Sequence, residues 1–230
     1  SATALRISFF GDTTHTITQT AGIVNAHIRL DNASEIVNLA SNLTITSTGS
    51  LTVDLGTLGI GTFTLNLDST FTQSGGSVTV GSGNFDVQGN FTQTGGSVSD
   101  VDFDGNAHNS TINQSGGATI GNMSVSQVAG GFFKLVTSDL TVTGNLTILS
   151  GDGTSALHAS GATRTINLGG NLIMTQGTLG NTTQLRISFV GDTTHTITQT
   201  GGTVNAHIRL DNANEIVNLA SSFTITSTGS

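Results

Sequence analysis

The chain has 230 residues, a formal net charge of −8 at pH 7, and a composition that is 35% hydrophobic but only 9% charged. So few charges exclude a disordered polyelectrolyte, and the acidic balance, with Lys134 as the single lysine, argues against nucleic acid or an anionic membrane as a partner. No apolar run is long enough for a membrane-spanning helix. Cysteine and proline are absent. Without cysteine, disulfides and thiolate metal sites are excluded. Without proline, no strand lacks a backbone N–H for pairing, which fits a structure in which nearly every strand lies between two others.

Nearly the same amino-acid sequence occurs at the beginning and at the end of the chain. Residues 5–50 return as residues 185–230, an offset of 180, with six mild exchanges over 46 positions. The strip THTITQT at residues 14–20 is among the parts that return unchanged. We therefore expect residues 1–230 to form a single continuous unit with a 180-residue long-range repeat, and we interpret the chain as a window of a longer tandem array.

The first copy predicts short β-strands. Apolar and polar residues alternate in ITQT (17–20), NAHIRL (25–30) and EIVNLAS (35–41), and turn-forming residues separate these strips. A period of two is typical of a strand with one buried face. The 3.6-residue period of an amphipathic helix is not evident anywhere in the chain.

A shorter repeat continues along the chain. The phrase TQTAG at Thr18 returns with small changes at Thr72, Thr92, Asn113 and Thr198. Each copy follows an apolar anchor, and the anchors, with related positions, are Ile17, Leu43, Phe71, Phe91, Ile112, Leu146, Leu172, Ile197 and Phe223. Their gaps run from 20 to 34 residues and centre near 26. This spacing predicts about seven turns per long repeat.

Together these features predict an all-β fold, a right-handed parallel β-helix (β-solenoid) with three short strands and about 26 residues per coil. Each strand would pair with its counterpart one turn away, and right-handed coiling is the strong default for parallel crossovers. Seven turns would give a rise of roughly 34 Å per 180-residue unit, at ~4.8 Å per turn. A stacked pair of separate sheets is the competing all-β fold, but irregular hairpins would not favour such similar strips at such regular spacing.

Strand parity assigns the two faces of the strip at residues 14–20. If Ile17 points inward, the glutamines of the T-Q phrase share its side and the threonines point outward. Inward glutamine is costly unless its amide is paired, and stacked coils can pair like amides in ladders about 4.8 Å apart. We therefore predict a structural inward ladder from Gln19, Gln73, Gln93, Gln114 and Gln199. The outward threonine row is Thr14, Thr16, Thr18, Thr20, Thr194, Thr196, Thr198 and Thr200.

Outward threonine rows on a flat parallel sheet also resemble ice-binding β-solenoids and surfaces that bind sugars. Against that reading, the outward residues change from turn to turn, through TFTQS, NFTQT, TINQS and NLTIL. Because threonine is a strong β-former, a structural role explains the row without a ligand.

Asp100, Asp102 and Asp104 alternate just before Gly105, so their carboxylates share one strand face. The run D-x-D-x-D-G resembles the start of a calcium loop, but Thr111 stands where a bidentate glutamate is expected. We interpret these residues as solvated aspartates on an ordinary strand, with a weak Ca²⁺ site as the alternative. No other cofactor is expected.

The sequence offers no catalytic constellation, so we expect no enzyme activity. A polysaccharide-degrading β-helix needs paired carboxylates, or acids with basic partners, in a groove. His27, Arg29, Asp31 and Glu35 recur 180 residues later. We interpret His27 and Arg29 as solvent-facing, with a surface ion pair between the arginine and an acid. Because the histidines are isolated, no metal site is predicted from them.

Asparagine followed by x-Ser/Thr occurs at several places in the chain. Asn90 and Asn145 lie on the outward parity and are the possible glycan sites if the protein is exported.

The strips LTVTGNLTILSG, INLGGNLIMTQGTLG and VQGNFTQTGGSV resemble the coils of bacterial extracellular β-helix repeat proteins, of the filamentous-haemagglutinin-like and giant adhesin type. The resemblance covers nearly the whole chain and transfers no binding residue. It implies an elongated, exported protein that is extracellular or at the cell surface.

The predicted function is structural, an extracellular fibre, filament or stalk built from tandem β-helical repeats. The near-identity of the two ends predicts a partner of the same kind, met head to tail along the solenoid axis, with lateral bundling as an addition. Neither nucleic acid nor membrane insertion of this segment is expected. The alternative is the shaft or binding module of a surface adhesin, but the chain has no tyrosine or tryptophan to stack on sugars.

Overall fold

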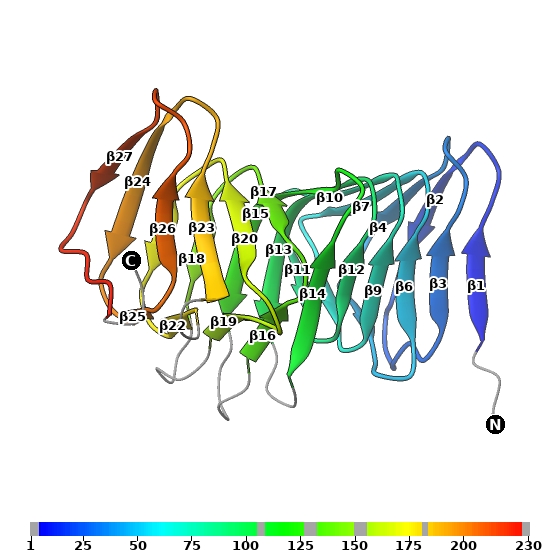
Figure 1. Ribbon diagram of the computed structural model, residues 1–230. Helices are drawn as coiled ribbons and strands as arrows, with labels where there is room; N and C mark the ends of the chain where they lie inside the picture. The colour runs from blue at the N-terminus through cyan, green and yellow to red at the C-terminus, as the bar shows by residue number, and fades with distance from the viewer. Residues whose placement is uncertain (1–4, 105–108, 127–132, 150–155, 181–183, 227–230) are drawn as a thin grey trace.

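The computed structural model describes residues 5–104, 109–126, 133–149, 156–180 and 184–226. Over these residues the chain is all-β and forms a parallel β-solenoid of about 9 turns, with roughly 22–26 residues per turn. The predicted fold class is confirmed. Figure 1 shows the turns stacked side by side, from the N-terminus at the right to the C-terminus at the left. None of the described residues belongs to a helix of the length and apolarity needed to cross a membrane.

Three columns of strands run along the solenoid, and we call them faces A, B1 and B2. Face A is a ten-stranded sheet. Its strands are β1 (Arg6–Phe9), β3 (His27–Leu30), β6 (Ser50–Val53), β9 (Thr70–Gln73), β12 (Phe91–Gln93), β14 (Ser110–Gln114), β16 (Phe133–Val136), β19 (Ala156–Ala159), β22 (Thr178–Leu179) and β25 (Thr203–Val204).

Faces B1 and B2 belong to one 17-stranded sheet. Face B1 holds β2 (Thr14–Ile17), β4 (Ile36–Leu39), β7 (Thr57–Gly61), β10 (Ser77–Val80), β17 (Leu140–Val142), β20 (Arg164–Leu168), β23 (Leu185–Phe189) and β26 (His207–Leu210). Face B2 holds β5 (Leu43–Ile45), β8 (Thr64–Leu67), β11 (Asn84–Val87), β18 (Leu146–Ile148), β21 (Leu172–Met174), β24 (Thr194–Gln199) and β27 (Ile216–Leu219). Two eight-residue strands, β13 (Ser97–Asp104) and β15 (Thr119–Ser126), cross both faces and join them.

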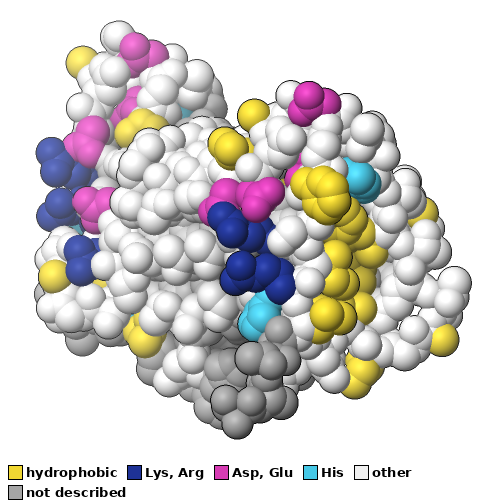
Figure 2. Space-filling view, turned by 90° about the vertical axis from the view of Figure 1, so that its right-hand side faces the viewer, with side chains coloured by type: hydrophobic (Ala, Val, Ile, Leu, Met, Phe, Trp, Pro, Cys, Tyr) yellow, Lys and Arg dark blue, Asp and Glu magenta, His cyan; other side chains and the backbone are white. Residues whose placement is uncertain are grey.

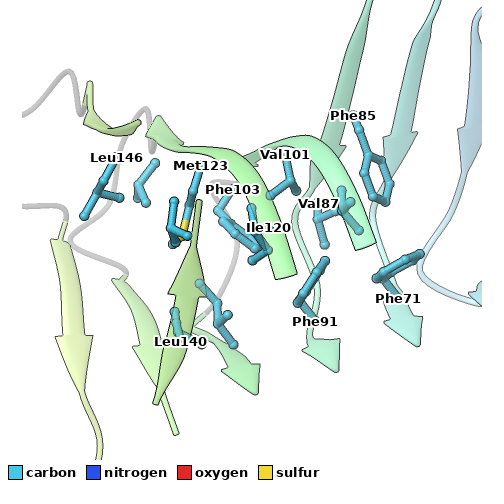
Figure 3. Packing of buried hydrophobic residues seen from close by; sticks show 14 of the residues in the cluster. Phe71, Phe85, Val87, Phe91, Val101, Phe103, Ile120, Met123, Leu140 and Leu146 are labelled. Atoms are coloured by element: carbon cyan, nitrogen blue, oxygen red, sulfur yellow. The ribbon is translucent and has the colours of Figure 1, made fainter. Parts of the chain in front are cut away.

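Inward side chains of neighbouring turns stack in register, and this stacking builds the core. On face A, Phe71 pairs with Phe91, and their rings stack with centroids 5.0 Å apart. Phe85 and Phe103 meet these two rings edge-on from face B2, at 5.2 and 5.3 Å. Figure 3 shows this group with the aliphatic side chains that continue it along the axis. Each fully buried aromatic or aliphatic side chain contributes on the order of 1.5–3 kcal/mol, so the column holds the short strands together.

The two copies of the duplicated text lie on different faces. Arg6–Phe9 forms β1 on face A, whereas the matching residues in β23 lie on face B1. The strip at Thr14–Ile17 lies on face B1, and its copy in β24 lies on face B2. Over 180 residues the strand register has therefore advanced by one face beyond a whole number of turns.

The 180-residue repeat contains more turns than the seven that its sequence spacing predicted. Face A passes through eight steps from β1 to β22, and β23 lies one face further on. The long repeat thus spans eight and one-third turns of strand register, and 180 divided by that figure is about 22 residues per turn, with a rise of roughly 40 Å. The sequence spacing suggested seven turns because its anchors come from different faces. Ile17 lies on B1, Leu43 on B2 and Phe71 on A, so a gap of 26 can be one turn plus one face.

Candidate functional site: the two ends of the solenoid

The first described turn leaves inward-facing apolar side chains uncovered. Leu5 is 68% exposed and Ile7 is 38% exposed, whereas their copies Leu185 and Ile187 are fully buried. The residue types are the same, and the difference is that β20 covers the second copy. Figure 2 looks onto this end and shows a band of hydrophobic side chains beside a group of basic and acidic ones.

The last described turn is open in the same way. Leu210 and Leu219 are 51% and 59% exposed, whereas their first-copy counterparts Leu30 and Leu39 are buried beneath the next turn. Each end therefore presents side chains that are buried wherever the same sequence has a further turn beside it.

The backbone is open at both ends as well. Among the described strands, β1 and β2 pair on one side only, with β3 and β4. At the other end β26 and β27 pair on one side only, with β23 and β24. A strand edge with unpaired N–H and C=O groups is a template for another strand. Over the part of the chain that the structure describes, the two ends thus combine exposed apolar side chains with strand edges that have no strand beside them.

The interior of the chain shows how such an end is covered. Strand β20 lies against β23 in parallel, with Ile166 opposite Ile187 and Leu168 opposite Phe189. The inward residues of β1, Ile7 and Phe9, are the counterparts of Ile187 and Phe189. The surface that is bare at the N-terminal end is therefore occupied by a parallel strand elsewhere in the same molecule.

Charged residues beside the N-terminal end form surface ion pairs, as the sequence suggested for Arg29. Its Nε donates to Asp54 Oδ2 at 2.7 Å and lies 3.7 Å from Asp31 Oδ2. The hydrogen bond to Asp54 raises the pKa of Arg29. Glu35 behaves differently, because it is fully buried and its Oε1 lies 3.6 Å from His15 Nε2. Burial raises the pKa of Glu35.

Three of the five glutamines predicted to point inward form a continuous amide ladder on face A. Gln73, Gln93 and Gln114 are buried. Gln93 Nε2 donates to Gln73 Oε1 at 3.0 Å, and Gln114 Nε2 donates to Gln93 Oε1 at 2.9 Å. This ladder satisfies polar groups that would otherwise be costly inside the core.

The other two glutamines are outside this ladder. Gln19 and Gln199 are half-buried in the strips on faces B1 and B2. Each donates from Nε2 to the carbonyl oxygen of the glycine three residues later, Gly22 at 2.7 Å and Gly202 at 3.1 Å. Gln73 and Gln93 also donate to the glycine three residues later, so the amide ladder between turns is what distinguishes the glutamines of face A.

The threonines of the predicted outward row do point away from the core, but they do not form one register column. Thr14, Thr16, Thr18 and Thr20 are exposed, and their second-copy counterparts are exposed or half-buried. The column of strand partners that starts at Thr14 on face B1 leads to Arg209 rather than to Thr194.

The acidic strand lies on face B2, with donors on the next turn. Asn122 Nδ2 donates to Asp100 Oδ2 at 3.1 Å, and Ser124 Oγ donates to Asp102 Oδ1 at 2.7 Å. Burial raises the pKa of Asp104 and of Asp100. Within the described ranges no group of three or more His, Cys, Asp or Glu residues is arranged to hold a metal ion.

An asparagine ladder accounts for the recurring G-N-apolar phrase, which sequence analysis did not interpret. Asn122 Oδ1 accepts the backbone N–H of Asn145, and Asn145 Oδ1 accepts that of Asn171, both at 2.9 Å. Asn171 Oδ1 accepts the N–H of Thr196 at 2.7 Å. Asn90, the other possible glycan site, accepts the N–H of Thr111 in the same manner at 3.0 Å. These amides satisfy donors at the corners between strands.

Sequence analysis also missed the position of Lys134, which is inward and almost fully buried. Its Nζ donates to the carbonyl of Gln88 and to Ser110 Oγ, each at 2.8 Å. Burial lowers the pKa of Lys134 to about 8. The available signal was strand parity, because Lys134 stands two residues before Val136, which is buried in the same strand.

A polar groove of about 370 Å³ runs along the corner between faces B2 and A, lined by residues that include His27, Asp68, Ser69 and Asn90. Small polar side chains and backbone dominate its walls, and no phenylalanine lines it. The one ring among the lining residues is the imidazole of His27, so the groove has none of the larger aromatic side chains on which sugar rings commonly stack.

No protein-family model, no curated protein and no solved structure matches the chain. The structure shows a β-helix repeat protein, and the resemblance to bacterial adhesins stays a prediction. The functional conclusion therefore depends on the geometry of the two ends.

Proposed function

We propose that the protein is a structural segment of an extracellular fibre, filament or stalk, in which solenoid turns continue head to tail from one unit to the next. The observation that supports this proposal is the contrast between the two copies, because Leu5 and Ile7 are exposed at the end while Leu185 and Ile187 are buried under β20. In this proposal a second unit supplies the turn that covers the open end.

The strands at the two ends are compatible with such a junction. Inside the chain, the side of β3 that corresponds to the open side of β26 pairs with β6, with Ile28 opposite Leu51 and Leu30 opposite Val53. At a junction the open side of the C-terminal β26 of one unit would meet the open side of the N-terminal β1 of the next, which is the side on which β20 covers β23. Apolar residues would again face apolar residues, and the free backbone groups of both edges would pair.

The gain from such a junction is large on the scale of protein association. Covering an exposed leucine, isoleucine or phenylalanine contributes roughly 1.5–3 kcal/mol. Leu5, Phe10, Ile23, Leu210 and Leu219 are each more than half exposed in the isolated chain. Only some of that surface would lie inside the contact, but a few such side chains offset the cost of association.

The location outside the cell is part of the same proposal and is supported by the resemblance of the coils to exported β-helix repeats. The adhesin-shaft alternative has the same architecture, and its ligand-binding residues would lie elsewhere. Enzyme activity and a bound cofactor are not part of the proposal.

The proposal is tested by electron microscopy and fibre diffraction of the purified chain. We expect rods with a spacing of ~4.8 Å along the axis and a longer repeat set by the unit. The variant Ile7→Lys places a charge among the inward residues of the open end and should abolish rods while leaving the strand signal in circular dichroism intact. Thr16→Lys, which adds the same charge to an outward position of the same end, should still form rods. Single, discrete particles from the parent chain at every concentration would refute the proposal.

A further inference from the structure

The strand columns twist around the solenoid axis. In Figure 1 the upright arrows at the N-terminal end belong to face A (β1, β3 and β6), whereas upright arrows at the C-terminal end belong to face B1 (β20, β23 and β26). The last strands of face A, β22 and β25, run along the lower edge instead. Face B1 has therefore rotated into the position that face A held at the other end.

The rotation of the columns can offset the shift of the second sequence copy from one face to the next. The second copy lies one face further along the coil than the first, and the columns turn in the opposite sense over the same length. To compensate the register advance fully, the columns would have to turn by one third of a revolution over eight and one-third turns, which is about 14° per turn and lies at the low end of the roughly 10–35° by which neighbouring strands rotate in twisted sheets. The twist is therefore an ordinary property of β-structure and needs no special device.

We infer that each 180-residue unit completes a whole number of turns, eight, in space, so that equivalent surfaces lie in line along one side of the fibre at intervals of roughly 40 Å. This inference rests on the proposed fibre. Strand β1 rises on the same side of the molecule as β23, and β2 descends as β24 does. A unit with a fractional number of turns in space would distribute its surfaces around the axis.

The aligned feature that best fits a partner is the threonine strip. Residues 14–20 expose four threonines with no acidic side chain among them, in a chain whose net charge is −8. Two such chains repel each other least where uncharged surface meets uncharged surface. A second fibre of the same kind has the same axial interval, so each of its strips can meet one strip of its neighbour. The strip is therefore assigned to lateral contact between parallel fibres.

The alignment within one chain can be measured without fibres. The chain has no cysteine, so Thr16→Cys/Thr196→Cys carries two spin labels at equivalent positions. Aligned copies should give a distance near 40 Å, the rise of the unit, whereas a one-face rotation would move the second label sideways by roughly 20 Å and lengthen the distance to roughly 45 Å. Ser34→Cys/Asn214→Cys, a second equivalent pair on a different strip, should give the same distance. The longer distance in both pairs would overturn the inference.

The lateral contact is tested on the rods themselves. We expect the parent rods to associate side by side in register, with cross-striations spaced by the rise of one whole 230-residue chain. Thr16→Lys/Thr196→Lys should leave rods intact but separate them, whereas Thr52→Lys/Thr72→Lys, which adds the same charge to outward positions of face A, should leave the bundles in place. If no rods form at all, the proposed function fails. If rods form and the strip variant bundles as the parent does, the fibre stands and the lateral contact is wrong.

Discussion

The side chain of Gln93 connects two neighbours inside the core, and this position makes its substitution informative. Gln93→Leu would leave Gln73 Oε1 without its donor and Gln114 Nε2 without its acceptor, both in a buried setting. Because each buried polar group that loses its partner costs about 1–3 kcal/mol, we expect a loss of roughly 2–4 kcal/mol in the free energy of unfolding. Urea denaturation followed by circular dichroism measures it.

Gln88→Leu is the matched control for this substitution. Gln88 is half-buried on the outward side, and its side chain makes one long hydrogen bond, 3.4 Å to Asn66 Oδ1. The same change of side chain should cost less than about 1 kcal/mol there. Equal losses for the two variants would mean that the amide ladder contributes nothing specific.

The ionised carboxylate of Asp86 destabilises the folded protein, so its effect on stability depends on pH. Burial, with repulsion from Asp104 and Asp102, raises its pKa to about 7 in the folded protein. A raised carboxyl pKa means that the folded state binds the proton more tightly than the unfolded state, so stability falls as pH rises from about 4 to about 7. Asp86→Asn should therefore raise the unfolding temperature at pH 8 and have little effect at pH 4.5.

The ionised carboxylate of Asp54 is expected to have the opposite effect and to stabilise the folded protein. Burial would raise its pKa, but hydrogen bonds from Ser74 and Arg29 outweigh burial and lower it. The ionised form is then favoured in the folded state, and its contribution is present at pH 8 and lost as pH falls through the acid range. Asp54→Asn should thus lower the unfolding temperature at pH 8. If both variants shift in the same direction at pH 8, the assigned environments are wrong.

At the scale of a turn, neighbouring glycines in the phrase QSGGA have different requirements. Gly116 and Gly117 both have positive φ, 63° and 74°. A Cβ on Gly116 would lie 2.0 Å from the carbonyl oxygen of Thr94 on the preceding turn, whereas a Cβ on Gly117 would meet nothing within 4 Å. Gly117→Ala should cost about 1 kcal/mol for the backbone conformation alone.

Gly116→Ala should cost clearly more, about 3 kcal/mol or above, because two turns must separate to make room. The pair of variants is compared by thermal unfolding under one set of conditions. A similar loss for both would show that the turns do not approach as closely as this contact requires.

The same scale shows what the sequence could and could not predict. Strand parity was sufficient for the fold class and for the inward direction of Gln73, Gln93 and Gln114, because alternation is a local property. The number of turns was not predictable in this way. An aliphatic anchor such as Ile17 suits any of the three faces, so only the pairing between turns shows which face it occupies. The burial of Lys134 was not predicted either, because its ammonium donates to carbonyl groups that lie slightly more than two turns away along the chain.

Across the whole molecule, stability should decrease from the middle turns toward the two ends. A solenoid turn contacts only its neighbours, so a terminal turn has half the interactions of a central one. The exposed Leu5 and Leu219 and the one-sided pairing of β1 and β27 are the structural signs of this difference. Backbone hydrogen exchange is the observable that reports local opening of this kind.

We therefore expect amide exchange, followed by mass spectrometry, to be fast in peptides covering residues 5–17 and 207–225 of the isolated chain and slow in peptides covering residues 71–103. On assembly into rods, both terminal regions should become protected together, because each junction covers one N-terminal and one C-terminal end at once. The central peptides should not change. The Ile7→Lys variant provides the reference for the unassembled state at the same concentration. Protection that appears instead on outward residues of the central turns, with the ends still exchanging, would mean that the chains associate through their sides and that the junction between ends does not form.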